Sequence, residues 1–430
     1  MEMQETSQEF ATEPVPSDHR VGWVRVALIS AMVAFSLPTF VTGIEVSSAV
    51  DSSTAIIAIL CGNALLAVIG AFCGAIGART GLSSYMLTRI AFGNRGAALV
   101  NIAFAISLLG WFGVNIDLFS GAVIRLLHDV MAIDAPGWQV ETAAGIVMTV
   151  TTIYGFRAIN TLSTLLVPVL MVVTALLIVS ALGVRPVGDT LALARDAELS
   201  FGDAMSSVVG GVIIGAIILP DITRFIREWR GGVYTAVLSY AVIGSVVQGA
   251  GGLAAIAFGN EDLLDVMILI GLSWAAFAIV IAGSWVLNSL NLYSTVLSVE
   301  ATLPRLENWL LIAVLGALGT LAAFFDILDR FLSFLFYLAI IFAPVAGVIV
   351  IDYLFVRRSA YHEDRAARQA MYVPQALVAW IAGAIVSLLG AKGVVTFTGI
   401  AALDAIAVAA VAYFALSRLG AGRAGAEGAA

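Results

Sequence analysis

The sequence predicts an all-helical membrane protein with twelve transmembrane helices, and three observations support that prediction. The chain is 61% hydrophobic and only 12% charged, with a mean hydropathy of +1.02, which is more apolar surface than a soluble domain of this size can bury. Apolar runs of about 17–25 residues, long enough to cross a bilayer, recur along the chain. Two of these runs are interrupted by proline and glycine, which hydrocarbon tolerates only where protein or water receives the freed backbone groups.

The predicted spans follow one another with short connections. They lie near residues 22–47, 53–77, 96–124, 140–156, 160–183, 204–226, 232–258, 266–297, 308–325, 330–355, 373–391 and 394–416. The polar, acidic segment 1–21 and the Gly/Ala-rich segment 417–430 are expected to form disordered tails on either side of a membrane domain at 22–416.

Arginine and lysine are unevenly distributed over the predicted loops. If the N-terminus is cytoplasmic, 16 of the 21 positive residues fall on the cytoplasmic side and five on the other. The positive-inside rule favours this orientation. We therefore expect a multi-pass protein of a bacterial-type inner membrane with both termini in the cytoplasm.

Few residues suit catalysis or metal binding. Cys61 and Cys73 fall in a single apolar run, and the three histidines, His19, His128 and His362, fall in a tail or near span ends. The sequence contains no His/Cys/Glu cluster with metal-ligand spacing and no hydrolase or nucleotide-binding motif in a credible context. We therefore expect no enzyme activity, no cofactor, no metal site and no nucleic-acid partner.

The sixth apolar run, from Ser207 to Arg227, contains Gly210, Gly211, Gly215 and Pro220. Glycine bends cheaply and proline removes a donor from the helical ladder, so a broken helix is one interpretation. The alternative is a kinked helix whose glycines only permit close packing against a neighbour.

The first run carries a second interruption at Pro38. Proline disfavours a helical conformation at the preceding Leu37, and Ser36, Thr39 and Thr42 offer hydroxyls in place of the lost backbone partner. Transporters bind substrate beside such discontinuous helices, which occur in repeats of opposite orientation. Breaks in spans one and six predict two five-span halves, 22–183 and 204–355, followed by two extra helices at 373–416.

Six short motifs, in their order along the chain, carry a resemblance to a known family. They are Cys61-Gly-Asn-Ala-Leu-Leu, Gly74-Ala-Ile-Gly-Ala-Arg-Thr-Gly-Leu-Ser-Ser, Ala91-Phe-Gly, Gly110-Trp-Phe-Gly113, Asp221-Ile-Thr-Arg-Phe225 and Ala343-Pro-Val-Ala-Gly-Val-Ile-Val-Ile-Asp-Tyr353. From about residue 25 to 416 the chain resembles the cytosine-permease branch of the nucleobase:cation symporters. The resemblance implies a leucine-transporter-type fold, with substrate held between spans one, three, six and eight.

Three residues match positions that this family uses to bind its substrate. The resemblance implies that Trp111 stacks on the heterocycle and that Asn288 reads its polar edge, whereas Asn115 matches an amide of hydantoin-transporting relatives. A packing role for Trp111 and a helix–helix hydrogen bond for Asn288 are the alternatives. The two breaks would add Ser36, Leu37, Gly210, Gly211, Val212 and Gly215 to the same site.

Four positions depart from the cytosine-permease pattern. Cytosine permeases have a Phe at Val212, Ser at Gly211 and Ile214, and a Gln at Leu108. Each good aromatic contact is worth roughly 0.5–1.5 kcal/mol, so these losses predict a substrate other than cytosine. A different, bulkier or more apolar nitrogen heterocycle is expected.

The coupling cation follows from two further observations. Sodium-coupled relatives place hydroxyl residues at the positions of Val286 and Leu287, which offer Na⁺ no oxygen, whereas Glu45 and Asp117 supply carboxylates inside spans one and three. Membrane carboxylates often carry protons, so H⁺ is favoured over Na⁺. The alternatives are an interfacial Glu45 and an Asp117 paired with Arg125 or Arg330.

The sequence therefore predicts a secondary-active importer of a nucleobase-like heterocycle such as cytosine, another pyrimidine or purine, or a hydantoin. Its partners would be that small molecule, a coupling cation and the lipid bilayer. A passive channel or facilitator, and a transporter-like sensor of the same ligands, remain the competing functions.

Overall fold

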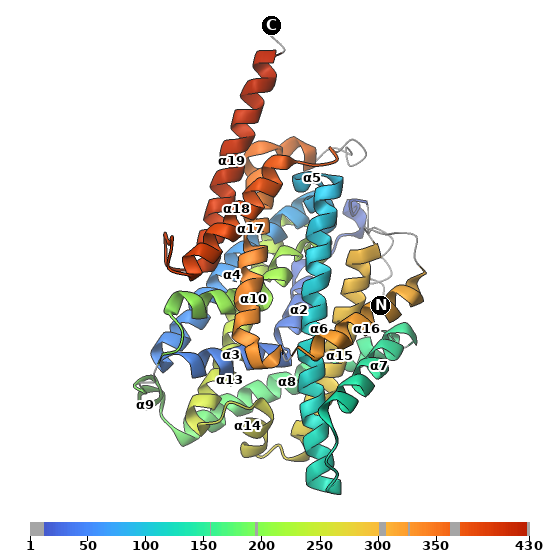
Figure 1. Ribbon diagram of the computed structural model, residues 1–430, viewed down its shortest axis with the longest axis vertical. Helices are drawn as coiled ribbons and strands as arrows, with labels where there is room; N and C mark the ends of the chain where they lie inside the picture. The colour runs from blue at the N-terminus through green and yellow to red at the C-terminus, as the bar shows by residue number, and fades with distance from the viewer. Residues whose placement is uncertain are drawn as a thin grey trace.

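The computed structural model describes residues 13–154, 156–193, 197–300, 307–325, 327–361 and 370–427, and the regular elements within those ranges are helices (Figure 1). The α-helices of the first half are α2 (Trp23–Ala34), α3 (Leu37–Ala49), α4 (Ser52–Thr80), α5 (Ser84–Phe92), α6 (Asn94–Met131), α7 (Gly137–Tyr154), α8 (Phe156–Val184) and α9 (Val187–Leu191). Those of the second half are α10 (Phe201–Ile217), α11 (Pro220–Thr223), α12 (Trp229–Ala236), α13 (Ser245–Phe258), α14 (Leu263–Leu269), α15 (Trp274–Glu300), α16 (Asn308–Ala323), α17 (Phe331–Ile351), α18 (Pro374–Ala391) and α19 (Ala401–Glu427). Short 3₁₀ or π segments are η1 (Ser17–His19), η2 (Val237–Gly244), η3 (Leu328–Arg330), η4 (Asp352–Val356) and η5 (Arg358–Tyr361).

Nine of the twelve predicted spans correspond to helices that, within the described chain, are long and apolar enough to cross a membrane. The other three differ. The run 22–47 is divided between α2 and α3, the run 140–156 is the more polar 18-residue helix α7, and the run 308–325 contains the 16-residue helix α16. In hydrocarbon a backbone satisfies its own hydrogen bonds only as a helix, which explains why the apolar runs fold in this way.

The first span is interrupted next to Pro38. Helix α2 ends at Ala34, Ser36 is extended (φ −132°, ψ 155°), and α3 begins at Leu37. The Thr42 hydroxyl donates to the Pro38 carbonyl at 2.8 Å, and the Ser36 and Thr39 hydroxyls lie 2.9 Å apart. At the break in the helical hydrogen-bond ladder, the Thr42 hydroxyl therefore bonds to a backbone carbonyl, and the other two hydroxyls bond to each other.

The predicted interruption at the glycines of the sixth span was wrong. Helix α10 continues through Gly210, Gly211 and Gly215, and it ends at Ile217, just before Pro220 begins the short helix α11. Glycine keeps its N–H and its place in the ladder, whereas proline cannot donate, so the break follows the proline.

Glycines instead allow close contacts between helices, and these contacts fall into two groups of helices. In one group, a Cβ at Gly43 of α3 would overlap the Gln248 backbone of α13, and one at Gly232 of α12 would overlap α4. In the other, Gly113 of α6 meets the end of α16, and Gly316 of α16 meets Thr149 of α7. Small residues at such contacts allow backbone-to-backbone packing, which is how membrane helices associate.

We name the two ends of the helix bundle by the helices that lie there, the α5 end and the α14 end (Figure 1). At the α5 end, the segment Val15–Val21 lies within the predicted tail 1–21 but contacts the folded chain. Val15 is 1% exposed and its N–H donates to Gly81, the Arg20 guanidinium donates to the Ala78 carbonyl at 2.9 Å, and the Val21 N–H donates to Phe225. This part of the segment therefore belongs to the folded domain. At the other terminus, α19 continues to Glu427, past the predicted tail boundary at residue 417.

A buried charge cluster also lies at the α5 end, where α17 passes into η4. Asp352 is fully buried and accepts hydrogen bonds from Arg357 (2.8 Å), Tyr361 (2.6 Å) and Tyr413 of α19 (2.6 Å). Burial alone would lower the pKa of Arg357, but the charge of Asp352 and the bond to it raise that pKa above its ordinary value. Burial and the Asp352 charge both raise the pKa of Tyr361 well above its ordinary value, so this hydroxyl remains a donor.

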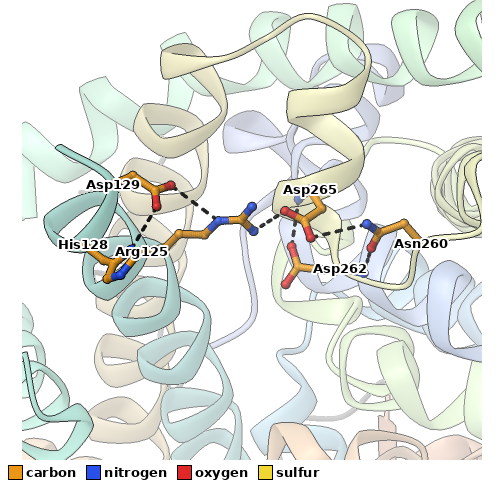
Figure 2. Close-up of polar contacts among 6 residues, drawn as sticks. All are labelled: Arg125, His128, Asp129, Asn260, Asp262 and Asp265. Atoms are coloured by element: carbon orange, nitrogen blue, oxygen red, sulfur yellow. Dashed lines mark hydrogen bonds and ion pairs between the residues drawn. The ribbon is translucent and has the colours of Figure 1, made fainter. Parts of the chain in front are cut away.

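The α14 end carries a more exposed charge network, drawn in Figure 2. Arg125, near the end of α6, pairs with Asp265 of α14 and, at 3.8 Å, with Asp129 one turn further along α6. Asp265 is held in turn by Asn260 at 3.3 Å, and its N–H donates to Asp262, which caps α14. The network therefore fixes α14 against the end of α6.

Candidate substrate site

Trp111 lies midway along α6, half-buried, with its indole against α17. Its ring centroid is 5.8 Å from that of Phe331 and 5.4 Å from that of Phe334, both edge-to-face. A Cβ at the preceding Gly110 would come within 2.8 Å of the Phe334 ring, so only glycine leaves room for this arrangement. Two rings thus support the indole edge-on, and part of it stays accessible.

Two buried amides lie beside Trp111. Asn115 donates to the Trp111 carbonyl at 2.7 Å, and Asn288 of α15 donates to the carbonyl of Phe112 at 3.0 Å. Both side chains are 0% exposed, and within the described residues neither Oδ1 atom has a hydrogen-bond partner. Both Nδ2 groups donate to α6, and that of Asn288 also donates to Met148 Sδ of α7 at 3.1 Å, which leaves two acceptor oxygens for something else.

Helix α17 also brings α10 to this region. Gly211 has room: a Cβ there would lie 3.6 Å from Thr42 Oγ1 and 3.7 Å from Leu335, ordinary contact distances. Gly210 has none, because a Cβ would overlap the backbone carbonyl of Leu335. Gly211 therefore faces α3, whereas Gly210 serves the packing of α10 on α17.

The remaining residues predicted from the two breaks lie on α3 and α10. Half-buried Val212 and Gly215 follow Gly211, and a Cβ at Gly215 would lie 3.7 Å from the Tyr240 hydroxyl. Ser36 is the extended residue before α3, and Leu37 packs against α15 at Gly283. Leu108 is half-buried on α6, about 60° around the axis from Trp111.

Neither of the two predicted coupling carboxylates lies beside the amides of Asn115 and Asn288. Six residues after Trp111, Asp117 lies about 120° further around α6, on the side of Gly113 that meets α16. Glu45 lies two turns beyond Leu37 on α3, where it interacts electrostatically with Glu261 in the loop before α14. Sequence periodicity alone could have excluded Asp117 from the Trp111 face.

Of the α15 positions near Asn288, Val286 is apolar and Ser289 is bonded within its own helix, whereas Ser284 is not. Val286 is 5% exposed and packs against Leu166 of α8, and the Ser289 hydroxyl donates to the Trp285 carbonyl at 3.0 Å. The Ser284 hydroxyl is buried without a partner among the described residues. Within those residues no group of three or more His, Cys, Asp or Glu side chains could hold a metal ion.

Three other charged residues, two of them in the family-like motif Asp221–Phe225, make structural contacts. Asp221 of α11 accepts hydrogen bonds from the backbone N–H and hydroxyl of Ser84 at 2.7 and 2.9 Å, which fixes the start of α5. Arg224 lies over the Phe225 ring, and burial lowers its pKa, an effect that Asp221 partly offsets. Asp404 caps the loop before α19 through the N–H groups of Phe397 and Thr398.

Phe331, Phe334 and Leu335 were missed by sequence reasoning. They connect α6 with α10 through Trp111 and Gly210, although they lie more than 100 residues away along the chain. The pair of phenylalanines three residues apart shares one helix face and was the available signal.

The pattern of the family described as "Permease for cytosine/purines, uracil, thiamine, allantoin" matches residues 14–415. The chain belongs to this family. It is therefore a multi-pass membrane transporter and not an enzyme, and the resemblance drawn from the six motifs is confirmed.

Individual relatives agree with this assignment. The cytosine permease of Escherichia coli K12 is 29% identical over 412 residues, which cover 95% of this chain and 94% of the relative. The hydantoin permease of Microbacterium maritypicum is 25% identical, covering 86% and 80%. Among solved structures, the inward-facing conformation of Mhp1 superposes with a TM-score of 0.82 at 18% identity, covering 95% of this chain and 93% of that one.

Proposed function

We propose that the protein is a secondary-active importer of a planar, nucleobase-like nitrogen heterocycle, driven by symport of a cation. The observation that carries the proposal is the half-buried indole of Trp111 beside the acceptor oxygens of Asn115 and Asn288. An indole stacks on a planar ring, and amide oxygens accept hydrogen bonds from ring N–H groups. The names of two relatives, a cytosine permease and a hydantoin permease, belong to this chemical class.

We further infer a five-plus-five arrangement of spans that alternates access to the site. It is supported by the discontinuities between α2 and α3 and between α10 and α11, and by the likeness to Mhp1. The excess of arginine at the α5 end favours a cytoplasmic location for that end, in an inner membrane.

The test of the site is the variant Trp111→Ala, with Trp285→Ala as the matched control. Trp285 is a half-buried α15 tryptophan that contacts Phe119 and donates to Thr151 outside the proposed site. Cytosine, uracil, hypoxanthine, allantoin and hydantoin would be screened for a ligand-induced rise in apparent stability, then assayed for uptake. We expect Trp111→Ala alone to abolish both signals, and an unchanged thermal shift in that variant would refute the stacking role.

Selectivity would be tested with Gly211→Ser and Val212→Phe together, which restore two groups of the cytosine-permease pattern. Gly211 has space for a side chain next to Thr42, so the serine should fit. We expect a shift of specificity toward cytosine. Gly210→Ser is the control for overpacking, because a Cβ there overlaps Leu335. A well-folded double variant that still ignores cytosine contradicts this argument.

For the coupling ion we propose H⁺ rather than Na⁺. Val286 and Leu287 offer no oxygen ligand, and Asp117 and Glu45 are the carboxylates available on α6 and α3. In proteoliposomes a pH gradient, and not a sodium gradient, should drive uptake. Asp117→Asn or Glu45→Gln should retain exchange but lose accumulation, according to which one carries the proton. Sodium-driven uptake that ignores pH would overturn the proposal, and linear flux without accumulation would indicate a facilitator.

A further inference from the structure

Span seven changes from α-helix to π-helix midway along its length. Helix α12 passes into η2, and α13 begins after it at Ser245. The Ser239 hydroxyl of η2 donates to Ser30 of α2 at 2.8 Å, which fixes η2 beside the first half of span one. π-Helical turns are rare within α-helices and occur frequently at functional sites. The residue after Ser239 is Tyr240, whose side chain lies against α4 and α10.

The ring of Tyr240 lies between α4 and α10. A Cβ at Gly70 of α4 would come within 2.7 Å of the ring, so glycine at this position leaves the room that the ring occupies. The hydroxyl at the far end of the ring lies 3.7 Å from the place of a Cβ at Gly215 of α10. Tyr240 as a whole is only 6% exposed. The side chain therefore carries a hydroxyl from span seven to the surface of span six.

The depth of this hydroxyl follows from contacts along α10 and α17. Gly210 of α10 packs on Leu335 of α17, and the preceding Phe334 contacts Trp111, so Gly210 and Trp111 lie at similar depth. Gly215 is five residues further along α10, or about 7.5 Å along the axis. The hydroxyl therefore lies little more than one helical turn from the level of the indole.

The face of α10 that the hydroxyl approaches is open. Gly211, Val212 and Gly215 are half-buried, whereas Ile213 on the opposite side of the helix is 0% exposed. Within 4 Å of a Cβ at Gly215, the described residues outside its own helical backbone place only a Val212 methyl at 3.3 Å and the Tyr240 hydroxyl at 3.7 Å. The short valine thus leaves the hydroxyl uncovered on this side. Because Gly211 faces α3 at the candidate site, the same open face joins the site to Tyr240.

The Tyr240 hydroxyl has hydrogen-bonding capacity that the protein does not use. Within the described residues it makes no hydrogen bond. A phenolic hydroxyl both donates and accepts, and leaving it unpaired inside a membrane protein is costly. The unpaired oxygens of Asn115 and Asn288 belong to other helices of the site, α6 and α15. Acceptors on α6 and α15 and a donor from η2 therefore border the same site.

We propose that the Tyr240 hydroxyl is a further substrate contact and that it selects fused two-ring heterocycles over single-ring ones. This assignment rests on the proposed function. With one ring stacked on Trp111 and its N–H groups bonded to Asn115 and Asn288, the second ring would extend over the open face of α10. There the hydroxyl would donate to a ring nitrogen or a carbonyl oxygen. A single ring held by the amides would end short of the hydroxyl, so the ligand class is purine-like.

The open space beside the hydroxyl can be tested without knowing the substrate. In a Cys61→Ser, Cys73→Ala background, Gly215→Cys would be compared with Ile213→Cys, which lies about 200° around α10. A charged, water-soluble methanethiosulfonate reagent should label the purified protein at least tenfold faster at Gly215→Cys. Adding Val212→Phe should slow this labelling at least tenfold, because the larger ring covers the space. Equal rates at the two positions, or no effect of Val212→Phe, would overturn the proposal.

The hydroxyl itself is tested with Tyr240→Phe, which keeps the ring that packs on Gly70. Hypoxanthine has two fused rings and uracil has one. In the thermal shift we expect the half-saturating concentration to rise about tenfold for hypoxanthine, since one hydrogen bond is lost, and less than about twofold for uracil. Tyr337→Phe is the matched control, because Tyr337 of α17 is 53% exposed, and it should change neither value. In a Val212→Phe background, Tyr240→Phe should have no further effect.

Failure of the Tyr240 contact can be distinguished from failure of the proposed function. If wild type prefers uracil, or if Tyr240→Phe leaves hypoxanthine binding unchanged or weakens both compounds equally, the selective contact is refuted and the transport of heterocycles is not. If none of the five compounds of the screen shifts wild type, the proposed function fails and this assignment fails with it. A lower melting temperature of unliganded Tyr240→Phe would also overturn the assignment, because it would mean that the hydroxyl bonds within the protein.

Discussion

At the α5 end, Asp352 is completely buried and accepts three hydrogen bonds from Arg357, Tyr361 and Tyr413, whereas at the α14 end Arg125 and Asp265 pair with 40% and 29% of their side chains exposed (Figure 2). Both networks join helices that are distant in sequence. The first connects the end of α17 with α19, and the second connects α6 with α14. They differ in what happens when a charged group loses its partner. At the exposed pair, water can take the partner's place, whereas at the buried cluster no other group can.

The difference indicates which helix contacts can separate during transport. A buried charge that loses its partner is uncompensated, so α17 and α19 are held together permanently at the α5 end. An exposed ion pair contributes little net free energy, so α14 can leave α6 at a small cost. Four substitutions, in decreasing order of expected effect, test this comparison.

The largest effect is expected for Asp352→Ala, which leaves Arg357 and two tyrosine hydroxyls without their acceptor. Removing one partner of a buried pair typically costs about 3–5 kcal/mol, so the free energy of unfolding should fall by that order. Thermal unfolding of the purified protein would measure it. Asp352→Asn, which keeps an acceptor but no charge, should lie between wild type and Asp352→Ala. A loss below about 1 kcal/mol would remove the distinction between the two ends.

Tyr361→Phe should have an intermediate effect, because it deletes one donor to a charged acceptor, worth about 1.5–3 kcal/mol. It should also change the dependence on pH. The pKa of Tyr361 is raised in the folded state, so its contribution is complete below the unfolded pKa of about 10 and is lost as the pH rises toward the folded pKa. The decline in stability above about pH 10 should therefore be shallower in Tyr361→Phe than in wild type. An identical alkaline profile would exclude Tyr361 as a contributor.

A smaller effect is expected for Arg125→Ala, about 0.2–1 kcal/mol, because solvent screens its pair with Asp265. The substitution should affect transport more than stability. Water-soluble reagents should reach the candidate site faster from the α14 end. The exchanged pair Arg125→Asp with Asp265→Arg should restore wild-type behaviour, and the effect of Arg125→Ala should shrink as salt is raised. If the exchanged pair behaves like the single variant, the pair does not hold α14.

The smallest effect is expected for Asp129→Asn, within about 0.5 kcal/mol, since Asp129 is half exposed and its oxygen lies 3.8 Å from Arg125. The same unfolding measurement would detect it. A larger loss would mean that the whole network in Figure 2, and not the Arg125–Asp265 pair alone, stabilises the α14 end.

The parts of this structure that could be predicted from sequence are those with local causes. The interruption near Pro38 depends on a missing N–H, and the spans depend on continuous apolar runs, both of which a single segment reveals. The glycines of α10 were misread because their effect depends on a distant partner, Leu335 of α17.

The candidate site shows the same limit. Trp111, Asn115 and Asn288 could be singled out as an aromatic and two amides at spanning depth, but the rings of Phe331 and Phe334 that support the indole come from a helix about 220 residues away. Asp117 could be placed on its helix, yet which neighbour that face meets depends on the packing of α16. Non-local contacts of this kind are not encoded in the spacing of one helix.

The segment Val15–Val21, which contains η1, has a consequence for how the protein is made. Val21 bonds to Phe225 and Arg227, which lie about halfway along the chain, and Arg20 bonds to the end of α4. The bonds to Ala78 and Gly81 can form once α4 has been synthesised, but the bonds to Phe225 and Arg227 form only after roughly half of the protein has been made. Until then α2 must remain in the membrane without this attachment, held by lipid and by whichever helices have already been inserted.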